Sequence, residues 1–226
     1  MNTRRNPPKT IPETFILESL TLDDEKENRK DGFLLSEILK LHGKHPIYFY
    51  FRTEKEFSEL LKEFHSTKYR YLHLSCYGDT NLIQYTLGSS TFDRFADLTQ
   101  GKLNNRRLFI SGCQVGQKEL ADAIFAKNGG MYSMTAPTSK VFFDQSISFW
   151  SAFYYMMSAW DSTSMKKKQL DKVLRQLAII FEMPLSHFYK NTGKGAIVDE
   201  QKFTADSKEL GKHSKGNLDS FNQNFG

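Results

Sequence analysis

Residues 72–79 read LHLSCYGD, and residues 108–116 read LFISGCQVG. Each stretch is an apolar run that stops at a cluster of small and polar residues, which is typical of a buried parallel strand and the loop that follows it. In an open α/β sheet, the loops at the carboxyl ends of the strands form the binding crevice. If these two strands are neighbours, Tyr77 and Cys113 lie near each other at that edge. The sequence therefore predicts a site there.

Strands and helices alternate on both sides of these two runs. Strands are predicted over residues 13–20, 46–51, 70–76, 107–112 and 131–136, with a shorter one over 82–87. Helices are predicted over residues 32–41, 54–65, 91–98, 117–127, 144–160 and 165–183. Because parallel strands must be joined by crossovers, this alternation predicts a three-layer α/β fold, an open and mainly parallel sheet with helices on both faces.

The composition fits one globular domain, since 39% of the 226 residues are hydrophobic and 25% are charged. We expect a flexible N-terminal segment over residues 1–12, a single domain over 13–199 and a polar, mobile tail over 200–226. No window approaches the about 18 apolar residues of a membrane span. The opening MNTRRNPPKT lacks the apolar segment of a secretory signal. Together with a count of only two cysteines, these features predict a cytoplasmic protein.

Several classes of partner are not expected. The net charge is +5, but no basic stripe interleaves with aromatic residues, so nucleic-acid binding is disfavoured. The cysteines and histidines lack the spacing of a zinc site, and no glycine-rich phosphate or dinucleotide motif is present. We therefore expect no metal, no cofactor and no membrane association. The oligomeric state stays open.

The two strand ends resemble those of caspase-like cysteine peptidases of the CHAT type. In that family a third strand is followed by His-Gly and a fourth by the catalytic cysteine, and the corresponding residues here read HLSCYG and FISGCQVG. The segment that begins at Asp144 and reaches Phe153-Tyr154 also resembles a helix of these domains. The resemblance spans roughly residues 13–160.

The resemblance implies roles for four residues. Cys113 stands at the position of the nucleophile, and the backbone N–H of Gly78 is a candidate donor to an oxyanion. Related peptidases place acidic residues near this edge to hold a basic substrate residue, which makes Asp144 a specificity candidate. Tyr77 stands where the catalytic histidine is expected.

Tyr77 is the main departure from the family. A tyrosine with an ordinary pKa near 10 is a poor base at neutral pH. Without a base, a thiol with a pKa near 8.5 is only a few per cent ionised at pH 7. His73 lies inside a predicted strand and is expected to be a buried structural residue, while His65 falls near a helix end. The position of His187 in the sheet stays open.

Three hypotheses remain. The first is a degenerate caspase-like domain that binds a protein or peptide partner, in a setting that the resemblance implies to be bacterial conflict or defence. The second is an active cysteine endopeptidase in which Cys113 uses a non-standard base. The third is an unrelated doubly wound module that binds a ligand. Taken alone, Cys113 is also explained as a buried structural thiol, and Asp144 as a helix N-cap.

Overall fold

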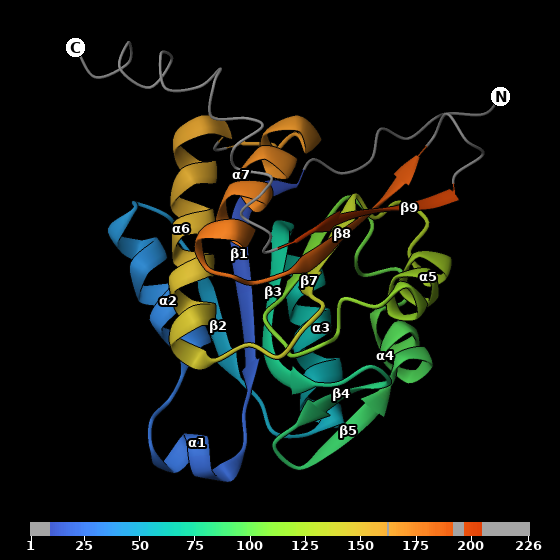
Figure 1. Cartoon of the computed structure of the whole chain (residues 1–226). Coiled ribbons are helices and arrows are strands. Elements are labelled where there is room, and N and C mark those ends of the chain that lie inside the picture. Colours follow the sequence, from blue (N-terminus) through green and yellow to red (C-terminus); the bar gives the residue numbers. More distant parts are fainter. Residues whose placement is uncertain (1–9, 162, 192–196, 205–226) are drawn as a thin grey trace, which may run out of the picture.

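A central sheet with helices on both of its faces forms the core of the computed structural model, which describes residues 10–161, 163–191 and 197–204 (Figure 1). The strands are β1 (Ile11–Ser19), β2 (Ile47–Tyr50), β3 (Tyr69–Gly78), β4 (Leu82–Tyr85), β5 (Gly88–Thr91), β6 (Arg107–Ile110), β7 (Ser133–Pro137), β8 (Leu185–Asn191) and β9 (Ile197–Phe203). The helices are α1 (Leu22–Lys26), α2 (Asp31–Leu41), α3 (Glu54–Thr67), α4 (Phe92–Thr99), α5 (Lys118–Lys127), α6 (Phe143–Asp161) and α7 (Lys167–Ile180).

The main strands lie in the order β2-β1-β3-β6-β7-β8-β9. The first five of these are parallel to one another, whereas β8 runs antiparallel to β7 and β9 antiparallel to β8. The hairpin of β4 and β5 pairs with the end of β3. The predicted fold class is confirmed. The condition on which the predicted site depended is met, because β3 and β6 are neighbours with Leu74 opposite Ile110.

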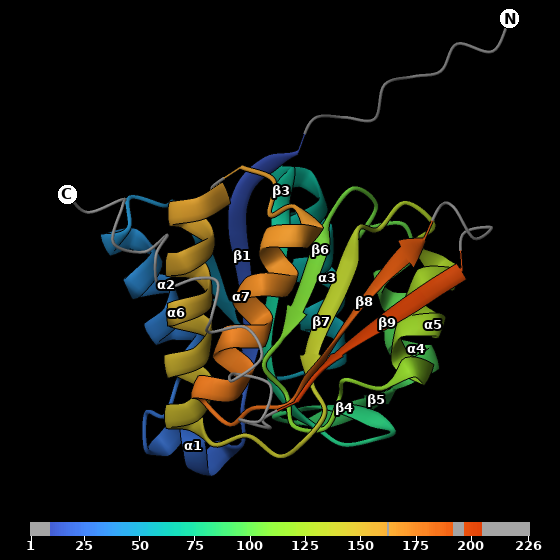
Figure 2. The same ribbon diagram turned by 45° about the horizontal axis from the view of Figure 1, so that its top comes forward.

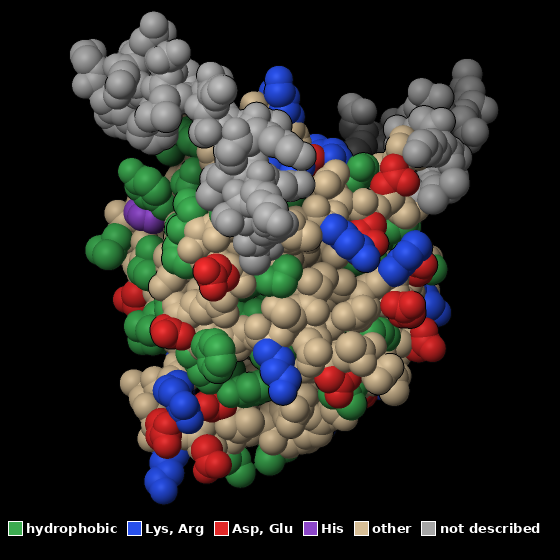
Figure 3. All heavy atoms as spheres, viewed as in Figure 1, with side chains coloured by type: hydrophobic (Ala, Val, Ile, Leu, Met, Phe, Trp, Pro, Cys, Tyr) green, Lys and Arg blue, Asp and Glu red, His purple; other side chains and the backbone are tan. Residues whose placement is uncertain are grey.

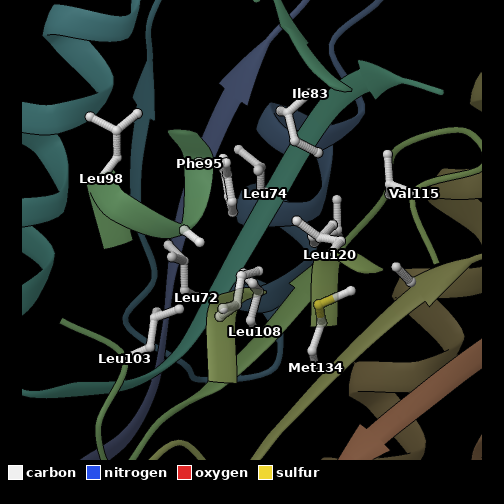
Figure 4. Close-up of a cluster of buried hydrophobic side chains, with 14 of the residues drawn as sticks. Leu72, Leu74, Ile83, Phe95, Leu98, Leu103, Leu108, Val115, Leu120 and Met134 are labelled. Carbon is white, nitrogen blue, oxygen red and sulfur yellow. The ribbon is translucent and has the colours of Figure 1, made fainter. Parts of the chain in front are cut away.

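The two faces of the sheet are covered by different helices. Helices α2, α6 and α7 lie on one face, and α3, α4 and α5 lie on the other (Figures 1 and 2). Leu72 and Leu74 of β3 point into the same cluster as Phe95 of α4 and Leu120 of α5 (Figure 4). Because side chains alternate along a strand, the intervening residues of β3, including Ser75, face α2 and α6 instead.

The register of β3 also accounts for one predicted structural histidine. His73 is buried on the α6 side, with its ring 5.0 Å from that of Trp150 and its Nδ1 3.3 Å from the Tyr154 hydroxyl. It lies well inside the strand, away from the edge where β3 ends. The prediction that His73 is a buried structural residue is confirmed.

The structure adds elements that the sequence patterns did not predict. The α1 turn, β5, β8 and β9 were all missed, because GSST in β5 and IVDEQKF in β9 carry too few apolar residues to read as buried strands. The predicted domain boundary at residue 199 falls inside β9, which continues to Phe203. Most of the predicted N-terminal segment and tail lies outside the described residues.

Charged side chains of both signs are interspersed over the face seen in Figure 3. Several lie within ion-pair distance, among them Lys202 and Glu200 of β9 at 3.7 Å. Within the part of the chain that the structure describes, no helix is long and apolar enough to cross a bilayer.

Candidate functional site

A cavity of about 280 Å³ opens where β3 and β6 end. Its lining residues are Leu20, Asp24, Arg29, Asp31, Ser75, Cys76, Tyr77, Ser111, Cys113, Val141, Phe142, Phe143 and Ser146. The structure thus brings Tyr77 and Cys113 to one pocket. The pocket also contains the carboxyl groups of Asp24 and Asp31 and the hydroxyls of three serines, to which sequence reasoning had assigned no role.

Cys113 lies in the loop that follows β6, and its side chain is half-buried. The Sγ atom is 3.5 Å from the carbonyl oxygen and 3.4 Å from the backbone nitrogen of Val141. The next residue, Gln114, adopts a φ of 58°, and its N–H donates to the carbonyl of Ser139. This tight turn holds the thiol against the segment that leads into α6 while leaving it open to the pocket. Cys76 is also a free thiol but is buried, and burial raises its pKa well above the usual range.

Tyr77 is held in place from the opposite side. Its hydroxyl donates to Asp24 Oδ2 at 2.8 Å, and its ring meets that of Phe143 edge-on at 6.0 Å. Burial first, and then the bond to Asp24, raise the pKa of this phenol well above its usual range. Asp24 is itself paired with Arg29 at 3.1 Å. Tyr77 is therefore a neutral donor whose hydroxyl is committed to Asp24.

The histidines of the described residues lie outside this pocket. Burial lowers the pKa of His73 to about 3. His187 is buried on β8, where it bonds to Thr135, and burial followed by nearby positive charges lowers its pKa well below the usual range. His65 lies beside Arg106, next to the start of β6 and so at the other end of the sheet. None of the pocket-lining residues is a histidine.

The floor of the pocket carries a carboxylate, Asp31, which begins α2 and is only 7% exposed. It accepts hydrogen bonds from Ser75 Oγ at 2.5 Å, Ser146 Oγ at 3.0 Å and Ser111 Oγ at 3.5 Å. Among residues 10–161, 163–191 and 197–204, no basic side chain forms an ion pair with it. Sequence reasoning missed Asp31, since an aspartate at a helix start is ordinarily explained by the helix dipole.

A further carboxyl group, that of Glu18, lies directly beneath this floor. Glu18 of β1 is fully buried and accepts from the N–H of Gly32 at 2.7 Å, the N–H of Phe33 at 3.2 Å and the Tyr48 hydroxyl at 2.7 Å. A Cβ at Gly32 would stand 3.2 Å from this carboxyl group, so glycine allows the close approach. Burial, and after it the charge of Asp31, raise the pKa of Glu18 to about 8.

Two residues suggested by the resemblance do not line the pocket. Asp144 is exposed and borders a neighbouring hollow with Lys30 and Leu34. The N-cap prediction for it is wrong, because α6 begins at Phe143 and Asp144 lies inside its first turn. Gly78 pairs with Ile83 of β4, and a Cβ there would stand 2.3 Å from Val115 Cγ1. Close packing against the loop after β6 therefore explains this glycine.

Comparison with known proteins gives a fold. No model of a known protein family matches the chain, and no curated protein matches it in sequence. Among solved structures, pro-sf-caspase-1 is similar with a TM-score of 0.50 and 14% identity, over 80% of this chain and 84% of that one. Caspase-1 from Spodoptera frugiperda is similar with a TM-score of 0.50 and 13% identity, over 89% of this chain and 92% of that one. The chain has the fold of the caspase-like cysteine peptidases.

Proposed function

We propose that this chain is a caspase-like domain with a degenerate cysteine–histidine pair, and that it binds a protein or peptide partner in the pocket without cutting it. The observation that carries the proposal is the side chain of Tyr77, which stands at the position where the resemblance expects histidine and whose hydroxyl donates a hydrogen bond to Asp24.

A cysteine peptidase needs a group that takes the proton from the thiol and later protonates the departing amine. Tyr77 is a poor candidate, because its raised pKa keeps the phenol neutral and its hydroxyl is already committed as a donor. Asp24 is engaged by both Tyr77 and Arg29. The lining residues of the pocket include no imidazole.

The pocket is suited to a cationic group. Asp31 places a buried negative charge at the floor, and the hydroxyls of Ser75 and Ser146 add oxygen atoms that accept from a guanidinium or ammonium. Leu20, Val141 and other apolar residues form walls suited to the methylene stem of a long basic side chain. We therefore propose that the pocket takes an arginine or lysine side chain of the partner.

Binding of N-acetyl-arginine methylamide tests this directly, with the citrulline analogue as its neutral isostere. Calorimetry should show at least about tenfold weaker binding of the citrulline compound, because the charged partner of Asp31 is lost. Asp31→Asn should weaken binding of the arginine compound by a similar factor. Asp144→Asn is the matched control, since that carboxylate is exposed and outside the pocket, and it should change affinity less than about twofold. Equal affinity for the two compounds would refute the cationic ligand.

An active endopeptidase is the second candidate, and the partly exposed thiol of Cys113 in the same pocket favours it. An arginine-containing peptide with a thiol-reactive end group should then label Cys113, and fluorogenic peptides should be cleaved at some pH between about 6 and about 9. Cleavage that is lost in Cys113→Ala would establish the enzyme. The binding proposal expects no cleavage, and expects Cys113→Ala to retain the biological activity of the wild type.

The resemblance to CHAT-type domains extends the proposal to a cytoplasmic interaction or effector component of a bacterial defence system. Such a component has a specific macromolecular partner. Affinity purification from the source cells should recover a protein with the wild type that is absent with Asp31→Asn. Recovery of the same proteins with both would argue against a role for this pocket in that interaction.

A further inference from the structure

The two carboxyl groups of Glu18 and Asp31 lie side by side under the pocket, but only Asp31 reaches it. Glu18 is fully buried, and its neighbours interact with it in opposing ways. Two backbone N–H groups and a tyrosine hydroxyl donate to it, which favours the charged form. Burial and the adjacent carboxylate favour the neutral form.

We propose that the Glu18–Asp31 pair couples cation binding to proton release: the pair holds one proton while the pocket is empty, and a cationic side chain arriving at Asp31 drives that proton from Glu18 into solvent. This inference rests on the cationic ligand proposed above and adds a regulatory property, dependence of partner binding on pH. The step is a simple exchange in which one positive charge enters the pocket and one proton leaves.

Few other charges face the pair. Helix α2 contributes Asp31 itself, and β2 contributes the neutral hydroxyl of Tyr48. Strand β3 and helix α6 contribute the hydroxyls of Ser75 and Ser146, both of which donate to Asp31. Within the described residues, no lysine, arginine or histidine forms an ion pair with either carboxyl group. Asp24 and Arg29 also line the pocket, but Arg29 is paired with Asp24 and Glu27. The incoming cation would therefore be the first positive charge to pair with Asp31.

The same geometry prepares Glu18 to lose its proton. The N–H groups of Gly32 and Phe33 and the hydroxyl of Tyr48 already point at the carboxyl oxygens, so the anion needs no rearrangement to be solvated. The pair lacks only a positive charge to offset Asp31. In the empty pocket, burial and the charge of Asp31 keep the proton on Glu18. A bound cation offsets the charge of Asp31 and leaves only the effect of burial.

The size of the coupling follows from Coulomb's law. A unit charge about 6 Å from Glu18 at an effective dielectric constant of about 20 lowers the pKa by about two units. The pKa of Glu18 would then fall from about 8 toward about 6 on binding. Near neutral pH this releases close to one proton. Affinity for the cation should rise about 100-fold between about pH 5 and about pH 9.

Calorimetry with N-acetyl-arginine methylamide, in two buffers of different ionisation enthalpy, measures the protons released. The wild type should release close to one proton near neutral pH. In Glu18→Gln, release should vanish and the affinity should stay at the low value of the wild type in acid, at every pH. Tyr48→Phe removes a donor that favours the charged form, so its affinity profile should shift to higher pH. Wild-type binding without proton release, or equal release by Glu18→Gln, would overturn the coupling.

The empty wild-type protein gives a test that needs neither ligand nor variant. Carbon NMR of the glutamate side chains should show one carboxyl group that titrates near pH 8. If every glutamate titrates below about pH 6, the shared proton does not exist and the coupling is refuted. Absence of any cation binding would instead refute the proposed ligand, and the coupling with it. The two failures are therefore distinguishable.

Discussion

Replacing Glu18 by glutamine should change how folding stability depends on pH. The pKa of Glu18 is raised in the folded protein from 4.5 to about 8, so between these values the folded chain binds a proton that the unfolded chain does not. The stability contributed by the protonated group is fully present below about pH 4.5 and is lost as the pH rises through about 8. The wild type should therefore lose stability over this range relative to Glu18→Gln.

The magnitude follows from the shift. Each unit of pKa difference corresponds to about 1.36 kcal/mol, so a shift of about 3.5 units sets an upper limit of about 5 kcal/mol for the relative change. Glutamine keeps an oxygen that accepts from Gly32, and its amide group replaces the oxygen that accepts from Phe33 and Tyr48. It titrates at no pH, so its contribution to stability stays constant. Urea unfolding followed by tryptophan fluorescence, at a series of pH values from about 5 to about 9, measures the difference.

The matched control is Glu37→Gln, whose carboxylate is exposed on helix α2. The Glu37 carboxylate bonds to Lys40, which lowers its pKa, so its titration is complete before the range of the experiment begins. The difference between this variant and the wild type should be flat across the series. A flat difference for Glu18→Gln as well would show that Glu18 is ionised in the folded protein, and would refute the reasoning.

Three further predictions concern the loops around the pocket. A Cβ at Gly116 would stand 2.6 Å and 2.8 Å from backbone oxygens of β7, so Gly116→Ala should cost about 1–3 kcal/mol in urea unfolding. Gly129→Ala, whose nearest atom would be 3.8 Å away, should cost less than about 0.5 kcal/mol, and equal costs would contradict the packing argument. A thiol reagent should modify one thiol of the native protein, and this modification should be absent in Cys113→Ala. Rapid modification of Cys76 would contradict the burial of that thiol. Tyr77→His should introduce hydrolysis of an arginine amide that disappears when Cys113 is also changed to alanine; if no hydrolysis appears, Tyr77 does not occupy the position of a catalytic histidine.

The sequence was sufficient for the parts of the fold that depend on local pattern. Apolar runs such as LHLSC and LFIS mark buried parallel strands, and the stripe of Phe57, Leu61 and Phe64 marks the buried face of α3. The rule that parallel strands end at a shared edge predicted that Tyr77 and Cys113 meet only if β3 and β6 are neighbours, and the strand order of the structure supplies that condition. The edge strand β9 was not predicted, because its several charged residues break the apolar pattern expected of a strand.

The roles of the Glu18 and Asp31 carboxyl groups were not predicted for a different reason. Glu18 lies in a strand and Asp31 at a helix start, and nothing in either local pattern distinguishes them from solvated residues. Their proximity is created by the packing of α2 onto β1, which is a tertiary contact. The glycine at position 32 was the only hint in the sequence, since a glycine near a helix start sometimes permits a close approach.

The order of strands also decides when this protein is most exposed to misassembly during synthesis. All the residues that line the pocket, from Leu20 to Ser146, leave the ribosome before β8 does. Until residues 185–191 arrive, the nascent sheet ends at β7, a strand whose residues are all buried in the finished molecule. An open edge on a strand that is buried in the finished molecule invites pairing with other chains. The hairpin of β8 and β9 forms last and covers this edge, and its outer strand β9 carries the charged residues Asp199, Glu200 and Lys202. The growing chain is therefore most prone to misassembly before that hairpin forms.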